Sequence, residues 1–378
     1  MNSKELGEIR RRIRPERSAI RHIYGCYVNG AKEIISYVDE SMGLMSKEES
    51  EEYLTLLRKS LSGTLGRSLM EISFATKQVM DSDEHRLLSA LRRTKLEDAA
   101  LRDEFYKCVI GALDMEDSNY LILLANDNYD IPHRGKDGQY IEDGDSVFSY
   151  ILCCICPVKS GKAALGFSSD ENRFHSCAVN QIVSSPELGF MFPAFDDRAA
   201  NIYAALFYSR SAEVIHQEFI DAVFRTDVPM SPVRQREAFS EALSAALEQE
   251  CSYGVVQSVH EQLSERIELH RESKDPEQLR ITVDEVADIL ESSGMSAERA
   301  GSFAEKCGEE FGKDAELTPM NIIDAKHFEV CTPEVTVKVD PKYSALISTR
   351  VIDGRRYILI PADGGVEVNG ISVTIPEE

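Results

Sequence analysis

The sequence predicts an α+β fold with three parts, and three observations support it. Short β-type runs fill the first half of the chain and its end, whereas amphipathic helical patterns fill the stretch between them. Hydrophobic residues make up 43% of the 378-residue chain, which is enough for each part to bury its own core. We therefore expect an α/β domain at 1–211, with a basic N-terminal helix and a largely antiparallel sheet, a helical domain at 212–318 and a small antiparallel β domain at 319–378.

The first elements are predicted to be a hairpin and a helix. Two β-type runs, Tyr24–Val28 and Glu33–Val38, flank Asn29-Gly30, a dipeptide that favours a tight hairpin turn. Ser46 and Glu49 have the spacing of a capping box, and leucines at helical spacing follow, so we expect a helix from 46 to 61. The next expected elements are a strand at 69–74 and helices around 84–91 and 97–113.

Two apolar runs in the middle of the first domain, Tyr120–Leu124 and Val147–Cys156, are predicted core strands. The segment between them is polar and glycine-rich, so it should be an exposed loop that makes the two strands antiparallel neighbours. Leu188–Phe195 is a further apolar run. The pattern at Asn201–Tyr208 fits either a strand or a helix, and periodicity does not decide between them.

Helical periodicity takes over in the second half of the chain. Ser231-Pro232 begins one helix with a cap residue and a proline at the first helical position, and Thr282 caps another. After Pro319 the pattern returns to short β-type runs separated by turn dipeptides such as Asp353-Gly354. A small antiparallel sheet is therefore expected at the end of the chain.

The charge of the chain is strongly negative, but one segment is basic. The 65 Asp and Glu against 42 Lys and Arg give a formal charge of −23, so the averaged field repels nucleic acid and anionic membranes. The segment before Ile23 reverses this sign with six arginines: Arg10, Arg11, Arg12, Arg14, Arg17 and Arg21. Any nucleic acid partner should therefore bind at this N-terminal basic helix.

The sequence predicts a cytoplasmic protein. The longest apolar stretch, Val147–Cys156, is about half of the roughly 20 residues that a membrane-spanning helix needs. The first residues run into a charged helix without the apolar core of a signal peptide. Nine cysteines, scattered through apolar segments, suit reduced thiols that pack as small hydrophobes.

Common catalytic and cofactor motifs are missing. Cys153 and Cys156 have C-x-x-C spacing, but on a strand residues three apart face opposite sides, so we expect buried thiols. Gly161-Lys162 lacks the earlier glycine and the following hydroxyl of a phosphate loop. The serine-hydrolase elbow and the zincin motif are also missing. The sequence indicates no cofactor and no resident metal.

Adjacent carboxylates follow an aromatic-rich apolar run at Asp196, Asp197 and Arg198. Carboxylates in such a place are either solvated or compensated, and Arg198 is the obvious compensator. A structural ion pair at a strand end is thus favoured over an active site, because ion-pair networks perturb carboxylates as readily as catalysis does. In an active site, the two carboxylates would bind a cation or act as a base.

A second candidate site combines Asp170, Glu171 and His175. These groups suit a metal site or acid–base chemistry. The spacing is not diagnostic, since a polar loop with a capping Asp and a solvated His explains it equally well.

The predicted helix pair at 282–311 has the proportions of a helix-turn-helix. Its second helix offers Arg299 and Lys306 against four glutamates, which would place net negative charge beside DNA phosphates. We therefore expect a packing module or a surface for a protein partner.

Three segments resemble a known bacterial family. Gly25–Asn29, Ser184–Arg198 and Thr349–Gly354 are similar to the family called domain of unknown function 4317, and the resemblance covers nearly the whole chain. It implies no activity. The order of the elements also resembles that of the 37-kilodalton nucleoid-associated proteins, an architectural likeness that transfers no functional residue.

Two functional hypotheses follow from the sequence. The first is a non-enzymatic cytoplasmic binding protein, nucleoid-associated, whose six N-terminal arginines contact phosphates, although a solvated amphipathic helix also explains such a charge run. The second is a carboxylate-based, metal-dependent enzyme with a site around Asp196, Asp197 and Arg198, joined by the second candidate cluster if both line one pocket.

Overall fold

The computed structural model describes residues 1–116, 118–131, 133–134, 140–141, 147–161, 164–168, 172–177, 181–226, 230–247, 252–312, 315–368 and 370–374. The chain divides into two compact units. The first holds residues 1–231 with 276–278, and the second holds 232–275 with 279–378.

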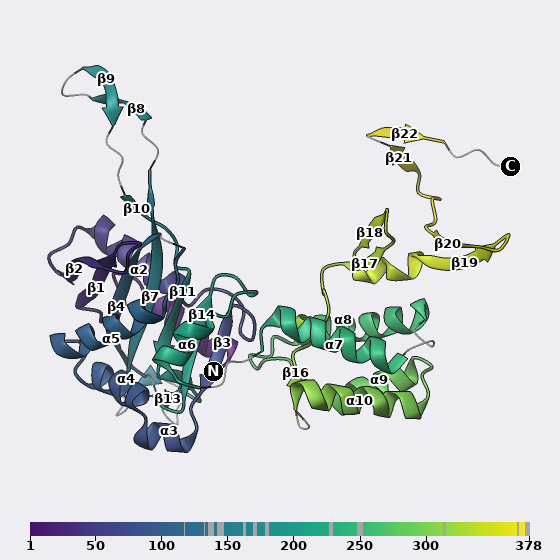
Figure 1. The fold of residues 1–378 in the computed structure, drawn as a ribbon, viewed down its shortest axis with the longest axis horizontal. Helices are drawn as coiled ribbons and strands as arrows, with labels where there is room; N and C mark the ends of the chain where they lie inside the picture. The colour runs from purple at the N-terminus through teal and green to yellow at the C-terminus, as the bar shows by residue number, and fades with distance from the viewer. Residues whose placement is uncertain are drawn as a thin grey trace. The chain divides into compact units, whose positions relative to one another are not determined.

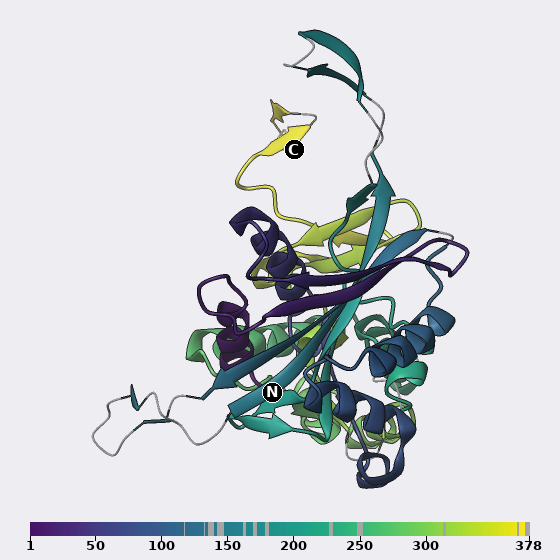
Figure 2. The same ribbon diagram turned by 90° about the vertical axis from the view of Figure 1, so that its left-hand side faces the viewer.

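An eight-stranded sheet is the centre of the first unit (Figure 1; Figure 2). Its strands pair antiparallel, which confirms the predicted fold class. In spatial order the strands are β2 (Ile34–Ser41), β1 (His22–Val28), β4 (Asn119–Asp130), β7 (Val147–Ser160), β11 (Leu188–Phe192), β14 (Ala204–Ser209) and β3 (Leu69–Ser73), and β10 (Gln181–Val183) also pairs with β7.

Among the described residues of this unit, three short antiparallel strand pairs accompany the sheet. They are β5 (His133–Arg134) with β6 (Tyr140–Ile141), β8 (Ala164–Ser168) with β9 (Arg173–Cys177), and β12 (Ala194–Asp196) with β13 (Ala199–Asn201). The segment Asn201–Tyr208, for which periodicity did not decide between strand and helix, contributes to the strands β13 and β14.

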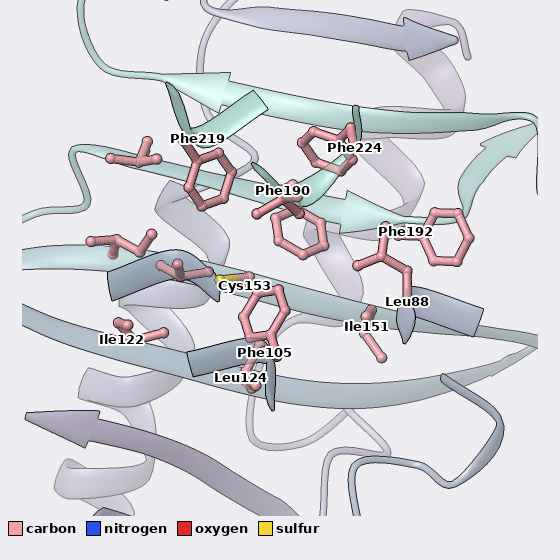
Figure 3. Close-up of a cluster of buried hydrophobic side chains, with 14 of the residues drawn as sticks. Leu88, Phe105, Ile122, Leu124, Ile151, Cys153, Phe190, Phe192, Phe219 and Phe224 are labelled. Atoms are coloured by element: carbon pink, nitrogen blue, oxygen red, sulfur yellow. The ribbon is translucent and has the colours of Figure 1, made fainter. Parts of the chain in front are cut away.

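Helices cover both faces of the sheet because its central strands are apolar on both sides. The helices of this unit are α1 (Ser3–Arg12), α2 (Lys47–Lys59), α3 (Thr76–Asp81), α4 (Asp83–Arg93), α5 (Ala99–Ala112) and α6 (Gln217–Val223). Leu121 and Leu123 of β4 pack in one cluster with residues of α1 and α2. Ile122 and Leu124 point to the opposite face, where Figure 3 shows them with Phe105 of α5 and aromatic residues of β11 and α6.

The first unit extends past residue 211 because α6 completes the core of the sheet. Phe219 of α6 lies 5.9 Å from Phe207 of β14, measured between ring centroids, and Phe224 lies 5.2 Å from Phe190 of β11. All four rings are buried. The unit boundary therefore falls at Ser231, and the division into three domains stays a prediction.

The second unit is a helical layer followed by short hairpins. Its helices are α7 (Pro232–Leu247), α8 (Tyr253–Ser273), α9 (Val283–Ser292), α10 (Ala297–Phe311), α11 (Pro319–Ile322) and the 3₁₀ helix η2 (Pro341–Leu346). Its strands pair as β15 (Ile281–Thr282) with β16 (Glu316–Leu317), β17 (Phe328–Cys331) with β18 (Thr336–Val339), β19 (Ser348–Ile352) with β20 (Arg355–Leu359), and β21 (Val366–Val368) with β22 (Ile371–Val373). The predicted C-terminal β structure is present as separate two-stranded pairs.

One glycine of the sheet is required by a close backbone approach. A Cβ atom added to Gly189 of β11 would lie 2.4 Å from the carbonyl oxygen of Cys153 and 2.9 Å from the Cβ of Ser60. The oxygen belongs to the neighbouring strand β7, so it cannot move without disturbing the sheet.

We predict that Gly189→Ala destabilises the first unit by about 3 kcal/mol, because the methyl group overpacks a core strand. Gly111→Ala is the matched control: nothing lies within 4 Å of the added Cβ, and alanine favours the helix. Denaturant unfolding of both variants measures the difference. Equal stabilities of the two variants would contradict the close approach of β7 and β11 at Gly189.

Candidate functional site

A buried carboxylate near the end of β4 anchors the N-terminal segment. Asp127 is fully buried and accepts a hydrogen bond of 2.7 Å from the hydroxyl of Tyr150. It also accepts from the backbone amides of Ala19, at 2.8 Å, and of Asn128, at 3.0 Å. The Nε atom of Arg12 lies 3.8 Å from its second oxygen. Burial raises the pKa of Asp127, although these donors oppose the shift.

The six N-terminal arginines divide into two groups. Helix α1 ends at Arg12, and two of the arginines on it bind backbone carbonyls of neighbouring elements. Arg10 donates to the carbonyl oxygens of Leu61 and, at 2.9 Å, of Gly63. Arg12 donates to the carbonyl oxygen of Asn128 at 3.1 Å. Arg12 thus fastens the helix to β4, and Arg10 fastens it to the segment that follows α2, so the charges of both side chains serve the fold.

The other arginines of the segment face solvent. Arg11 lies on α1, and the rest follow it before β1 begins: Arg14, Arg17 and Arg21. The backbone between them is held by Ile13 and Ile20, which are 0% and 5% exposed. The predicted basic helix is thus a short helix followed by an ordered, arginine-bearing connection.

The Asp196-Asp197-Arg198 cluster is a hairpin turn. Asp196 of β12 pairs with Ala199 of β13, which leaves Asp197 and Arg198 as the two turn residues. Both have left-handed backbone conformations, with φ of 48° and 56°. Positive φ at both positions is typical of a type I′ turn, which connects two adjacent antiparallel strands tightly.

The ion pairs around this turn differ from the prediction. The guanidinium of Arg198 lies 3.0 Å from the Glu8 carboxylate of α1, a partner far from it in the sequence. Its backbone amide donates to Glu5 at 3.1 Å. Asp196 lies 3.0 Å from the Met1 ammonium. Burial alone would raise the pKa of Asp196, but the ammonium and the other hydrogen-bond donors lower it below its usual value. The cluster joins the hairpin to α1.

The second candidate cluster is not assembled by the described residues. Asp170 and Glu171 lie outside them, and His175 lies on β9 opposite Gly166. Within the described part of the chain, no group of three or more His, Cys, Asp or Glu side chains could hold a metal ion.

The thiols of β7 face both sides of the sheet, as strand geometry predicts. Cys153 packs in the cluster that includes Cys26, whereas Cys154 and Cys156 pack in the cluster on the α1 and α2 side. All four are buried, and burial raises the pKa of Cys153 well above that of a free thiol. Their predicted burial is confirmed.

A group of cations that the sequence analysis did not predict lies beside the ends of β4 and β7, on the face of the sheet opposite α1. Helix α4 ends in Arg92 and Arg93, and Lys95 follows in the turn. Arg92 donates from Nε to the carbonyl oxygen of Ser149 on β7, at 2.7 Å. The run Arg92-Arg93-Thr94-Lys95 is visible in the sequence as a group of cations. The sequence does not show, however, that this group lies beside β7.

The basic side chains of the helix pair in the second unit bind another helix. On α10, Arg299 donates to the carbonyl oxygen of Ala246 and Lys306 to that of Ala245, both at 2.8 Å. These carbonyls belong to the last turn of α7, where cations are favourable. The cations that DNA recognition would need are therefore engaged inside the unit.

Comparison with known protein families matches residues 1–371 to the family described as Domain of unknown function (DUF4317). The chain belongs to this family. No curated protein matches it, so the architectural likeness to nucleoid-associated proteins gains no support. Among the described residues of this family member, the helices are too short or too polar to cross a membrane.

The pKa shift of Asp127 predicts a pH-dependent stability. Because burial raises its pKa above the reference value of 3.8, the folded chain binds more protons than the unfolded chain between the two pKa values. The contribution of Asp127 to the free energy of unfolding should therefore fall as the pH rises through that window. Asp127→Asn removes this titration, so the stability of wild type relative to the variant should decrease from pH 4 upward. Denaturant unfolding at several pH values measures it.

The control is Asp130→Asn, an exposed position on the same strand. Its stability difference from wild type supplies the baseline. If the free energy of unfolding of wild type relative to Asp127→Asn increased with pH, the raised pKa of Asp127 would be contradicted.

The hairpin-turn assignment predicts small stability changes. Arg198 is 46% exposed, so Arg198→Gln should cost about 1 kcal/mol through the lost pair with Glu8. Asp197→Asn should be neutral or slightly stabilising, because asparagine tolerates positive φ. Chemical denaturation checks both. A loss of about 3 to 5 kcal/mol for Arg198→Gln would instead indicate a buried counter-ion.

Proposed function

We propose that this chain is a non-enzymatic binding protein whose first unit contacts the phosphates of nucleic acid. The observation that carries the proposal is the division of the N-terminal arginines, two of which fasten the segment while the other four face solvent. The proposed phosphate contacts are Arg11, Arg14, Arg17 and Arg21.

The order of the segment supports this proposal. Ile13 and Ile20 bury their side chains at its two ends, and the amide of Ala19 is bonded to Asp127. Arginines on a fixed backbone lose less conformational entropy on binding than arginines in a flexible tail. The local charge is also favourable, because only Glu16 interrupts the arginines between residues 10 and 21, and it lies 3.9 Å from Lys47.

The rival enzyme hypothesis has less support. Asp197 and Arg198 are turn residues, and Asp196 already has the Met1 ammonium and the Asn201 amide as partners. A catalytic carboxylate needs an open position for substrate or metal. We keep nucleoid association and a cytoplasmic location as part of the proposal, and the unpaired, buried thiols of β7 suit a reducing compartment.

We predict salt-sensitive binding of duplex DNA or RNA to the full-length protein. Affinity should fall with salt with a log–log slope of about −3 to −4 on duplex DNA, since each neutralised phosphate contributes about −0.9. Replacing Arg11, Arg14, Arg17 and Arg21 with Gln should remove most of this slope. Fluorescence anisotropy between low and physiological salt measures it.

The matched control removes four exposed arginines from the second unit, with the same change in net charge: Arg271, Arg350, Arg355 and Arg356, each to Gln. This control should keep the wild-type slope. No binding at low salt, or equal loss in both quadruple variants, would overturn the proposal.

A further inference from the structure

A cationic cavity lies at the end of α4, on the face of the sheet opposite the N-terminal segment. It is open to solvent and has a volume of about 820 Å³ between the helix and the ends of β4 and β7. A volume of this order suits a small organic ligand. Its lining residues are Arg86, Ser89, Ala90, Arg92, Arg93, Lys95, Asn128, Val147 and Ser149.

Four of the described residues in the lining are cations, and none of these described residues is a carboxylate. Arg86 is compensated by Asp83, at 2.7 Å, and by Asp81, at 3.8 Å. Arg93 and Lys95 are exposed and have no ion pair within 4.0 Å among the described residues. In a chain of charge −23, this concentration of positive charge favours an anionic ligand.

Lys95 has an unfavourable backbone conformation. Lys95 and Leu96 have left-handed conformations, with φ of 52° and 65°, and the Leu96 amide donates to the Leu91 carbonyl oxygen at 2.9 Å. Helices that end in this way favour glycine at the left-handed position, because any side chain there is strained. Lys95 at this position lines the cavity, and Leu96, which follows it, is buried.

Beside the cations, the described lining has three neutral polar residues, Ser89, Asn128 and Ser149, and two apolar ones, Ala90 and Val147. Asn126 donates to the Ser149 hydroxyl at 3.3 Å and to the Tyr150 carbonyl oxygen at 3.0 Å, which orients Ser149. Ser89, Asn128 and Ser149 offer hydroxyl and carboxamide groups, which match the hydroxyl groups of a polyol. None of the described lining residues is aromatic, so the cavity lacks a platform on which a nucleobase would stack.

We propose that this cavity binds a phosphorylated sugar or polyol. Arg93 and Lys95 contact the phosphate groups through charge-assisted hydrogen bonds, and Arg92 adds positive charge from a side chain held against β7. Ser89, Asn128 and Ser149 contact the hydroxyl groups of the ligand. This site is separate from the proposed nucleic acid contacts, because none of those four arginines lines the cavity.

Isothermal titration calorimetry of the full-length protein at low salt tests the proposal, with fructose 1,6-bisphosphate as the probe. We expect saturable binding of one equivalent, no binding of unphosphorylated fructose, and weaker binding of AMP than of the bisphosphate. Lys95→Gly should weaken the bisphosphate about tenfold or more, because it removes a charged hydrogen-bond donor. The same variant should be at least as stable as wild type, because glycine relieves the strained backbone.

Three further variants complete the test. Arg93→Gln should also weaken binding, whereas Lys77→Gln and Lys107→Gln, exposed lysines of the same unit outside the cavity, should not. The quadruple arginine variant should keep bisphosphate binding, which separates this proposal from the nucleic acid proposal. The inference is overturned by the absence of saturable binding, by tighter binding of AMP, or by bisphosphate affinity that survives Lys95→Gly or is lost in the quadruple variant.

Discussion

The first unit depends on the burial of one carboxylate, Asp127, near the end of a central strand. Burying a charge is unfavourable unless donors replace water, and here a hydroxyl, two backbone amides and a guanidinium surround it. One of those amides, that of Ala19, belongs to the connection between α1 and β1. The same group therefore fixes the strand and holds the arginine-bearing segment against it.

Successive side chains of β4 point to opposite faces of the sheet, and this alternation relates Asp127 to both proposed binding surfaces. Asp127 and Tyr129 face α1, so Asn126 and Asn128 must face the opposite side, where α4 ends. A shift of the register by one residue would bury the asparagines and expose the carboxylate. The pairing of Asn128 with Ser149 then brings the polar ends of β4 and β7 together beside the cations of α4. The register of β4 with β7 thus positions the arginine-bearing segment on one face of the sheet and the cavity on the other.

Local patterns predicted the elements well and the candidate sites poorly, for one physical reason. The hairpin around Asn29-Gly30, the capped helix α2 and the antiparallel pair β4 and β7 are determined by residues close in sequence, and each was predicted correctly. The role of Arg198 depends on Glu8, which lies 190 residues away in the chain. Likewise, no periodicity distinguishes Arg10 and Arg12, which bind carbonyl groups, from exposed Arg11. Such roles require knowing which strand lies next to which helix.

The strong negative charge of the chain constrains how either surface would work. At physiological ionic strength the screening length is about 8 Å, so a phosphate several screening lengths away experiences little of the local cations. Attraction then begins only when phosphates approach the arginines or the cavity closely, while the remaining acidic surface disfavours other orientations. Such a charge distribution sacrifices long-range steering, which uniformly basic nucleic acid-binding proteins exploit, and gains discrimination against polyanions that do not match the cationic surface. On this argument, affinity should depend more on the exact placement of a few cations than on net charge, so neutralising distant carboxylates should alter binding far less than removing a single contacting cation.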